Sequence, residues 1–187
     1  MKKLKCLLLT LFSLIVCSED SIPYVLSYEN GVVELQGQFQ EGKQVGTWEA
    51  FYDNGELKER AEWLKGRLEG KIESFYEDGK KQSIGMFKNG VQVKQWSYFH
   101  STGFLESKGS FLEGLRSDEW TFYDEEGKIK SRGFFEDNRE NGPFVYFYPN
   151  GKEESKGDFK NGIRAGMWQN FDTSGKFIFN TKYLKKW

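Results

Sequence analysis

The chain has 187 residues, of which 17% are aromatic and 21 are glycine, whereas only three are proline. This composition favours short β-strands joined by glycine turns over helices. The 27 basic and 28 acidic residues alternate in sign, so the chain has no basic stripe of the kind that binds nucleic acid.

The first residues are typical of an export signal. Three lysines open the chain, and a run that is apolar apart from two hydroxyl residues follows over Cys6–Cys17. That run is too short to cross a bilayer and predicts a signal peptide over residues 1–18. Two outcomes stay open. The segment ending at Cys17 resembles a bacterial lipobox, in which Cys17 is lipidated, although Val16 is not the small residue that the motif prefers. Cleavage after Ser18 is the alternative.

Export predicts a protein of the periplasm, an outer-membrane lipoprotein or a secreted protein. Removing the three leader lysines from the 27 basic residues leaves 24 against 28 acidic residues, a mildly acidic body. Both cysteines, Cys6 and Cys17, lie in the leader. We therefore expect no internal disulfide and no thiolate metal site in the body.

After the leader, the sequence repeats every 24 residues. One column of large residues sets the register: Trp48, Ile72, Trp96, Trp120, Phe144 and Trp168. A second column is aromatic throughout: Phe39, Trp63, Phe87, Phe111, Phe135, Phe159 and Tyr183. The register extends back to Tyr24, so we expect seven copies that pack on one another as a repeat array over residues 22–187.

Each copy predicts a β-hairpin. In one copy, residues 47–52 form the first strand, Asp53-Asn54-Gly55 the turn, and residues 56–63 the return strand. Apolar and charged residues alternate along the return strand, which indicates one packed face, including Leu57, and one solvated face. Two-residue turns join the copies, and Asn138 replaces their usual glycine once, which indicates positive φ there. The predicted fold class is an all-β, elongated single-domain antiparallel meander of about seven 24-residue hairpins.

Two columns of small residues accompany the rings. The first comprises Gly37, Ala61, Gly85, Gly109, Gly133 and Gly157. Glycine weakens a strand unless the space is needed, so we expect each of these residues to accommodate a ring of the neighbouring strand. The second column comprises Ser83, Ser107, Ser131 and Ser155, for which we expect a hydroxyl ladder across the sheet.

A further aromatic column is the candidate binding surface: Phe51, Phe75, Phe99, Tyr123, Phe147 and Phe171. Its residues have the opposite parity to the tryptophan column. Either a bulge brings both sets of rings to one side, or the sheet carries rings on both faces. The second alternative would leave a continuous aromatic stripe near solvent, suited to contact with a partner.

No catalytic pattern emerges from the remaining residues. The single histidine, His100, occupies a column that is otherwise mostly tyrosine, which favours a structural role. Carboxylate pairs lie at solvated turns, and the turns do not stack enough carboxylates to bind calcium. We therefore expect no enzymatic activity, no cofactor and no metal.

The pattern Gly-x-Trp-x-x-Phe/Tyr-x-x-Gly resembles the MORN repeat and, more closely, its bacterial variant that is often classed as antitoxin-like. The resemblance runs from Tyr24 to Tyr183, with departures at Ile72, Lys94 and Asp118. It implies a twisted array of hairpins, and it links the chain with protein–protein contacts, membrane association and a proposed antitoxin role.

Together these observations predict a non-enzymatic scaffold that binds a protein or peptide partner in the cell envelope or outside the cell. Two alternatives stay open: an antitoxin-like protein that neutralises a toxin, and a membrane-surface lipoprotein that binds lipid head groups. The acidic body argues against unaided adsorption to anionic lipid.

Overall fold

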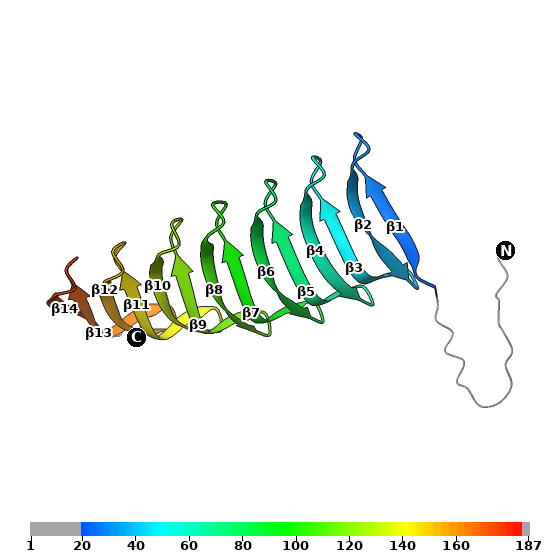
Figure 1. Ribbon diagram of the computed structural model, residues 1–187. Helices are drawn as coiled ribbons and strands as arrows, with labels where there is room; N and C mark the ends of the chain where they lie inside the picture. The colour runs from blue at the N-terminus through cyan, green and yellow to red at the C-terminus, as the bar shows by residue number, and fades with distance from the viewer. Residues whose placement is uncertain (1–19, 185–187) are drawn as a thin grey trace, which may run out of the picture.

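The computed structural model describes residues 20–184 as one sheet of 14 antiparallel strands, each paired with its neighbours in sequence (Figure 1). In chain order, the strands are β1 (Ile22–Ser27), β2 (Val33–Gln40), β3 (Lys43–Phe51), β4 (Leu57–Leu64), β5 (Arg67–Phe75), β6 (Lys81–Lys88), β7 (Val91–Phe99), β8 (Leu105–Leu112), β9 (Leu115–Tyr123), β10 (Ile129–Glu136), β11 (Arg139–Phe147), β12 (Glu153–Lys160), β13 (Ile163–Phe171) and β14 (Phe177–Tyr183). The predicted all-β meander of hairpin repeats is confirmed.

The predicted leader, with Cys17 and the cleavage position after Ser18, lies outside the described residues. Within residues 20–184 there is no helix with the length and apolar character needed to cross a membrane.

Two kinds of turn alternate along the chain, and each kind lies at its own edge of the array. At one edge, the amide of Gly55 donates to the carbonyl of Tyr52 at 2.9 Å, and the same hydrogen bond recurs in every hairpin. At the other edge, both residues of each two-residue turn have positive φ, as in type I′ turns. Asn138 is one of them, at φ 66°, so the backbone geometry inferred from its sequence is confirmed.

A bulge near the end of each hairpin decides which side chains share a face. Ala50 pairs with Glu59, whereas the next residue, Phe51, pairs with Leu57, so Lys58 is the extra residue. The bulge turns Leu57 to the opposite face from Glu59. The prediction that Leu57 lies on the packed face was therefore wrong, because simple alternation does not survive the inserted residue.

A second bulge sets the position of the large rings. Ala61 pairs with Ile72 and Trp63 with Leu68, so three residues of β5 oppose one residue of β4. At the middle of this bulge, Gly70 has φ 114°. Lys94 and Asp118 keep positive φ at the equivalent position, at 61° and 60°, although side chains disfavour this region. The bulge is thus retained even where glycine is absent.

Each large ring lies directly on a glycine of the preceding strand, as the small-residue column predicts. A methyl group at Gly109 would overlap the indole of Trp120, and one at Gly157 would lie 2.5 Å from Cδ1 of Trp168. The contact between the second and third copies departs from this pairing in both residues, because Ala61 of β4 faces the smaller Ile72 of β5. The two columns therefore fit each other in size.

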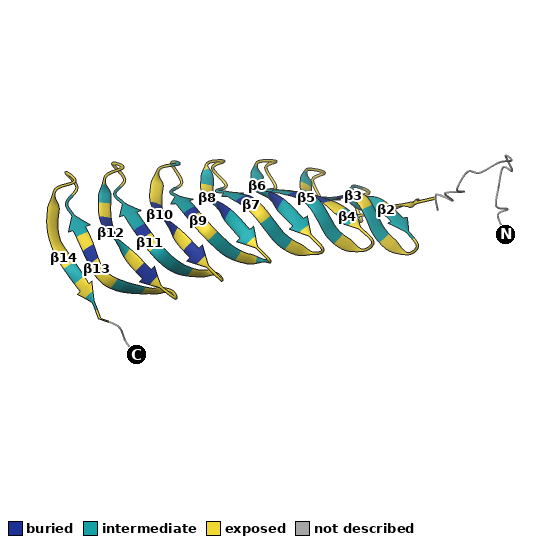
Figure 2. Cartoon of the chain, turned by 90° about the horizontal axis from the view of Figure 1, so that it is seen from below, coloured by how far each residue is buried: buried dark blue, intermediate teal, exposed yellow. Residues whose placement is uncertain are grey.

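The indole nitrogens tie the rings to the backbone. Trp120 Nε1 donates to the carbonyl of Ser110 at 3.1 Å, and equivalent bonds to residues ten positions earlier are made by Trp48, Trp96 and Trp168. Rings of the second aromatic column pack edge-on, such as Phe111 against Trp120 with centroids 5.2 Å apart. As a result, Trp120 and Trp168 are fully buried in a single-layered sheet. Figure 2 shows the buried positions as dark bands that recur from hairpin to hairpin.

The serine column does not form the expected continuous ladder. Ser74 and Ser83 share a hydrogen bond of 2.7 Å, but Ser107 pairs across the sheet with Tyr98 on one side and Phe122 on the other. Rings thus alternate with hydroxyl groups from strand to strand. The ladder prediction was wrong because it considered only the return strands and not the strands between them.

Replacing Trp96 with alanine removes a ring that is 4% exposed and that covers Gly85. We expect the Trp96→Ala variant to lose about 3–5 kcal/mol of unfolding free energy, as for other buried aromatic truncations. Urea unfolding followed by circular dichroism measures this loss. An unfolding curve that coincides with that of the parent would contradict the burial of this column.

Adding a methyl group at Gly109 tests the fit between ring and glycine. The Gly109→Ala variant should lose about 1–3 kcal/mol, because the new Cβ overlaps the indole of Trp120. The same substitution should cost less in a Trp120→Ile background, which reproduces the natural pair of Ala61 and Ile72. Equal costs in both backgrounds, measured by urea unfolding, would show that the ring does not lie on the glycine.

Candidate functional site

The candidate binding residues form a line on the face opposite to the tryptophan column. Phe51 pairs with Leu57 beyond the bulge, so both side chains lie on the face opposite to Trp48. At the other end of the line, the ammonium group of Lys156 lies 5.2 Å from the ring centre of Phe171. The structure thus corresponds to the second of the two alternatives, with rings on both faces of the sheet. We call the six residues Phe51, Phe75, Phe99, Tyr123, Phe147 and Phe171 the phenylalanine stripe; all six are half-buried.

The two faces therefore differ in chemistry. The face that carries the columns of Trp48 and Phe39 is called here the tryptophan face. The other carries the phenylalanine stripe beside charged side chains such as Glu49 and Arg60, and is called the charged face. Successive stripe residues lie two strands apart, so their rings repeat at intervals of roughly 9.5 Å along the array.

A column of hydrogen bonds holds the stripe residues at this interval. The hydroxyl of Tyr52 donates to the carbonyl of Phe75 at 2.8 Å, and the hydroxyl groups of Tyr28, Tyr76 and Tyr148 bond the stripe residue of the next copy in the same way. His100 replaces tyrosine in this column, and its Nε2 lies 3.2 Å from the carbonyl of Tyr123. His100 thus links two hairpins, in agreement with its structural interpretation.

Hydrogen bonds from side chains to backbone carbonyls also link successive turns. Asn54 Nδ2 donates to the carbonyl of Glu77 in the next turn at 3.2 Å, while its Oδ1 accepts from the amide of Glu56. Asn30 and Asn150 make equivalent bonds to the following turns. Backbone groups at this edge are thereby paired between hairpins, which favours a uniform spacing of the stripe.

Charges beside the stripe are paired in the N-terminal copies. Arg60 Nε lies 2.7 Å from Glu49, and hydrogen bonds from Arg60 and Gln36 hold the pKa of the Glu49 carboxyl below its ordinary value. Lys81 and Lys71 lie 2.8 and 2.9 Å from Glu73, and their hydrogen bonds lower its pKa likewise. These carboxylates stay ionised at neutral pH and neutralise the neighbouring cations.

Towards the C-terminal copies, the position of Glu49 and Glu73 is occupied by uncharged residues: Ser97, Thr121, Val145 and Gln169. There, the guanidinium of Arg132 lies 5.7 Å from the ring centre of Phe147. Arg132 also lies 4.0 Å from Glu119, and Lys156, which lies over Phe171, is 2.8 Å from Glu153, so cation–ring contacts accompany ion pairs in this half.

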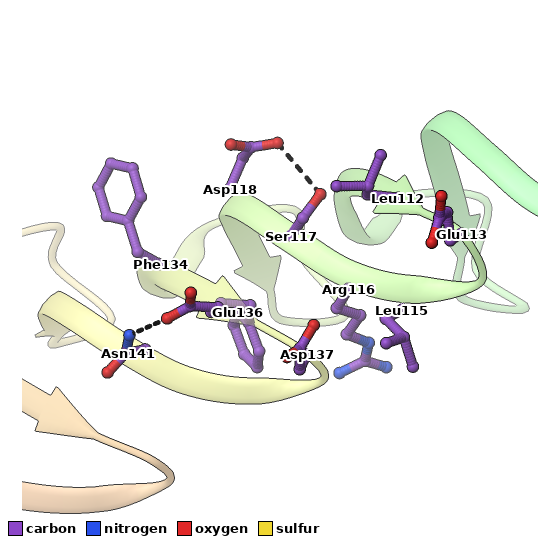
Figure 3. A pocket seen from close by; sticks show the side chains of 11 residues that line it. Leu112, Glu113, Leu115, Arg116, Ser117, Asp118, Phe134, Glu136, Asp137 and Asn141 are labelled. Atoms are coloured by element: carbon purple, nitrogen blue, oxygen red, sulfur yellow. Dashed lines mark hydrogen bonds between the residues drawn. The ribbon is translucent and has the colours of Figure 1, made fainter.

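One hollow is a shallow depression of about 390 Å³ between two turns of the array (Figure 3). Leu112, Leu115 and Phe134 line it beside the carboxylates of Glu113 and Glu136. None of its lining residues is a histidine or cysteine, and the hydroxyl of Ser117 donates to the neighbouring Asp118 carboxylate at 3.1 Å. Across residues 20–184, no group of three or more potential ligands is arranged to hold a metal.

The sequence had already identified the residues of the phenylalanine stripe as candidates. It did not identify a second feature, which lies on the tryptophan face. Arg116 and Arg164 lie there against aromatic rings, in a column that also holds Gln92, Leu68 and Glu140. No sequence signal separated the two arginines from other surface charges, because the column has no common chemistry.

Comparison with protein families identifies the repeat. The model described as MORN repeat variant matches the chain at residues 44–65, 68–89, 119–137 and 140–161. Each match falls on one hairpin, for example β3 with β4. A search of curated proteins found no match. MORN repeats are a non-catalytic type of repeat and generally bind proteins or lipids. The four matched hairpins and the three others share one period and one geometry, and the chain is therefore a MORN-repeat protein.

Proposed function

We propose that this protein is a non-enzymatic repeat scaffold that binds a protein partner along the phenylalanine stripe. The observation that carries the proposal is the line of six half-buried rings at one interval on the charged face. Aromatic residues are the commonest anchors of protein interfaces. Because hydrogen bonds between hairpins already order the stripe, its binding would cost little conformational entropy.

The charges beside the stripe favour a protein partner over a lipid surface. Glu49 and Glu73 are 22% and 12% exposed in their side chains and lie beside Arg60, Lys71 and Lys81. Such mixed charge suits the polar rim of a protein interface. An anionic lipid surface attracts unpaired basic residues instead, whereas Arg60, Lys71 and Lys81 on this face are paired with carboxylates.

We further propose that the protein is exported and acts in the cell envelope or outside it. The support is the basic start and apolar run within residues 1–18. A leader of this kind counts against neutralisation of a cytoplasmic toxin. A lipid anchor at Cys17 would add membrane attachment without changing the contact surface.

Two stripe substitutions test the contact surface. We expect the Phe99→Ser, Phe147→Ser double variant to lose a partner that the parent captures from cell extracts, because two anchors are removed. The matched control is Phe134→Ser, which removes a 43% exposed ring outside the stripe. Thermal unfolding checks that both variants are folded. Equal capture by the parent and a folded double variant would contradict the proposed surface.

The intact mass of the protein recovered from membrane and soluble fractions tests export. A chain that begins at a diacylated Cys17, or one that begins at Glu19 without lipid, agrees with the proposal and decides between the two forms of processing. An uncleaved chain in the cytoplasm would overturn it.

A further inference from the structure

Two arginines on the tryptophan face are held against aromatic rings. The guanidinium of Arg116 lies 4.7 Å from the ring centre of Trp120 and 5.8 Å from that of Phe135. The guanidinium of Arg164 lies 4.1 Å from the ring centre of Trp168. Arg164 also lies near Tyr146 and Tyr183, and its Nη1 donates to the hydroxyl of Tyr183 at 3.2 Å.

Neither arginine has a carboxylate partner within the described part of the chain, where no ion pair includes Arg116 or Arg164. On the charged face, by contrast, Arg60 and Lys81 are paired with carboxylates. Stacking on a ring occupies a face of the planar guanidinium, and its N–H donors point along the edges. Both arginines therefore retain donors that suit a carboxylate or another planar anion.

The spacing of the two groups suggests how one ligand could reach both. Arg116 in β9 and Arg164 in β13 occupy the same position of copies two units apart, with four strand intervals between them. That separation is roughly 19–20 Å along the array. An extended chain rises about 3.3 Å per residue, so about six residues of it span the distance. The half-buried rings of Phe122 and Tyr146 lie on the same face as the arginines, beside Trp120 and Trp168.

We propose that Arg116 and Arg164 are two anion-recognition points for an extended acidic peptide segment of a partner protein, which carries carboxylates about six residues apart. The segment would cross the strands, with apolar side chains on the rings between its two carboxylates. The site lies on the face opposite to the phenylalanine stripe and does not rest on the function proposed for the stripe.

An acidic peptide fits this site better than an anionic membrane. The guanidinium groups lie within 4.7 and 4.1 Å of ring centres, and both arginines are half-buried, so a planar bilayer would reach them poorly. Glu140 in β11 occupies the same position in the copy between them. Its carboxylate, and those of Glu113 and Glu136 that line the hollow beside Arg116, would oppose a continuous anionic surface, whereas a peptide can place neutral residues beside them.

A pair of labelled peptides tests the proposal. The probe is a 12-residue peptide with two aspartates six positions apart and tyrosine and serine between them. Its matched comparison has asparagine at both positions. Fluorescence anisotropy at low salt should show that the aspartate peptide binds the parent at least about tenfold more tightly. Emission of the tryptophans beneath the arginines should change on binding.

Substitutions locate the binding on the protein. Arg116→Gln and Arg164→Gln should each weaken binding of the aspartate peptide at least about fivefold, because each removes one charged fork. Arg116→Lys should weaken it less, since it keeps the charge. The control is Arg132→Gln, which removes an arginine over a ring on the charged face and should leave the affinity unchanged. Circular dichroism confirms that each variant is folded.

Three outcomes would overturn the proposal. They are equal affinity for the aspartate and asparagine peptides, equal loss in Arg132→Gln and Arg116→Gln, and arginine-dependent binding to phosphatidylglycerol vesicles without binding to the peptide. The last outcome would assign the arginines to lipid head groups. The stripe variant Phe99→Ser, Phe147→Ser should still bind the aspartate peptide, so failure of one surface does not imply failure of the other.

Discussion

The contact on which the whole structure depends is the placement of a large ring on the bare backbone of a glycine in the preceding strand. A single-layered sheet has no second layer to cover its apolar face. Here, the ring of one copy lies on Gly109 or its equivalents, and the edge of a neighbouring ring closes over it. The rings are therefore buried by contacts between neighbouring copies within the sheet. Each hairpin completes the core of the one before it, which is the coupling expected of a repeat array.

This coupling also determines what the protein can do. Ring contacts, the tyrosine column and the asparagine bonds between turns all operate between adjacent hairpins, so the same interval of two strands is imposed on every surface feature. The result is a long molecule with two differently decorated faces and no deep pocket among the described residues. Its surface carries rings and charges at regular intervals, an arrangement that suits extended partners better than the enclosure of a small molecule.

Much of the fold could be predicted from the sequence because steric constraints determine which residues recur at each period, in the turns and in the small-residue column. Asn138 and Gly109 are examples, since left-handed backbone geometry and ring contact exclude most other residues. The bulge at Lys58 could not be predicted, because an inserted strand residue needs no special side chain. Its omission reversed the face expected for Leu57 and left that of Phe51 open. The role of Arg116 depends on Trp120 lying beneath it, which only the three-dimensional register shows.

The most direct test of the ring-on-glycine contact is the proton NMR spectrum of the glycine Hα atoms. A proton that lies beneath an indole is shifted strongly upfield by the ring current. The structure predicts such shifts for Gly37, Gly85, Gly109 and Gly157, and the return of Gly109 to an ordinary value in Trp120→Leu. The Hα of Ala61, which faces Ile72, should lack the shift. Ordinary glycine Hα shifts in the folded parent would contradict the contact and with it the account of how this sheet is held together.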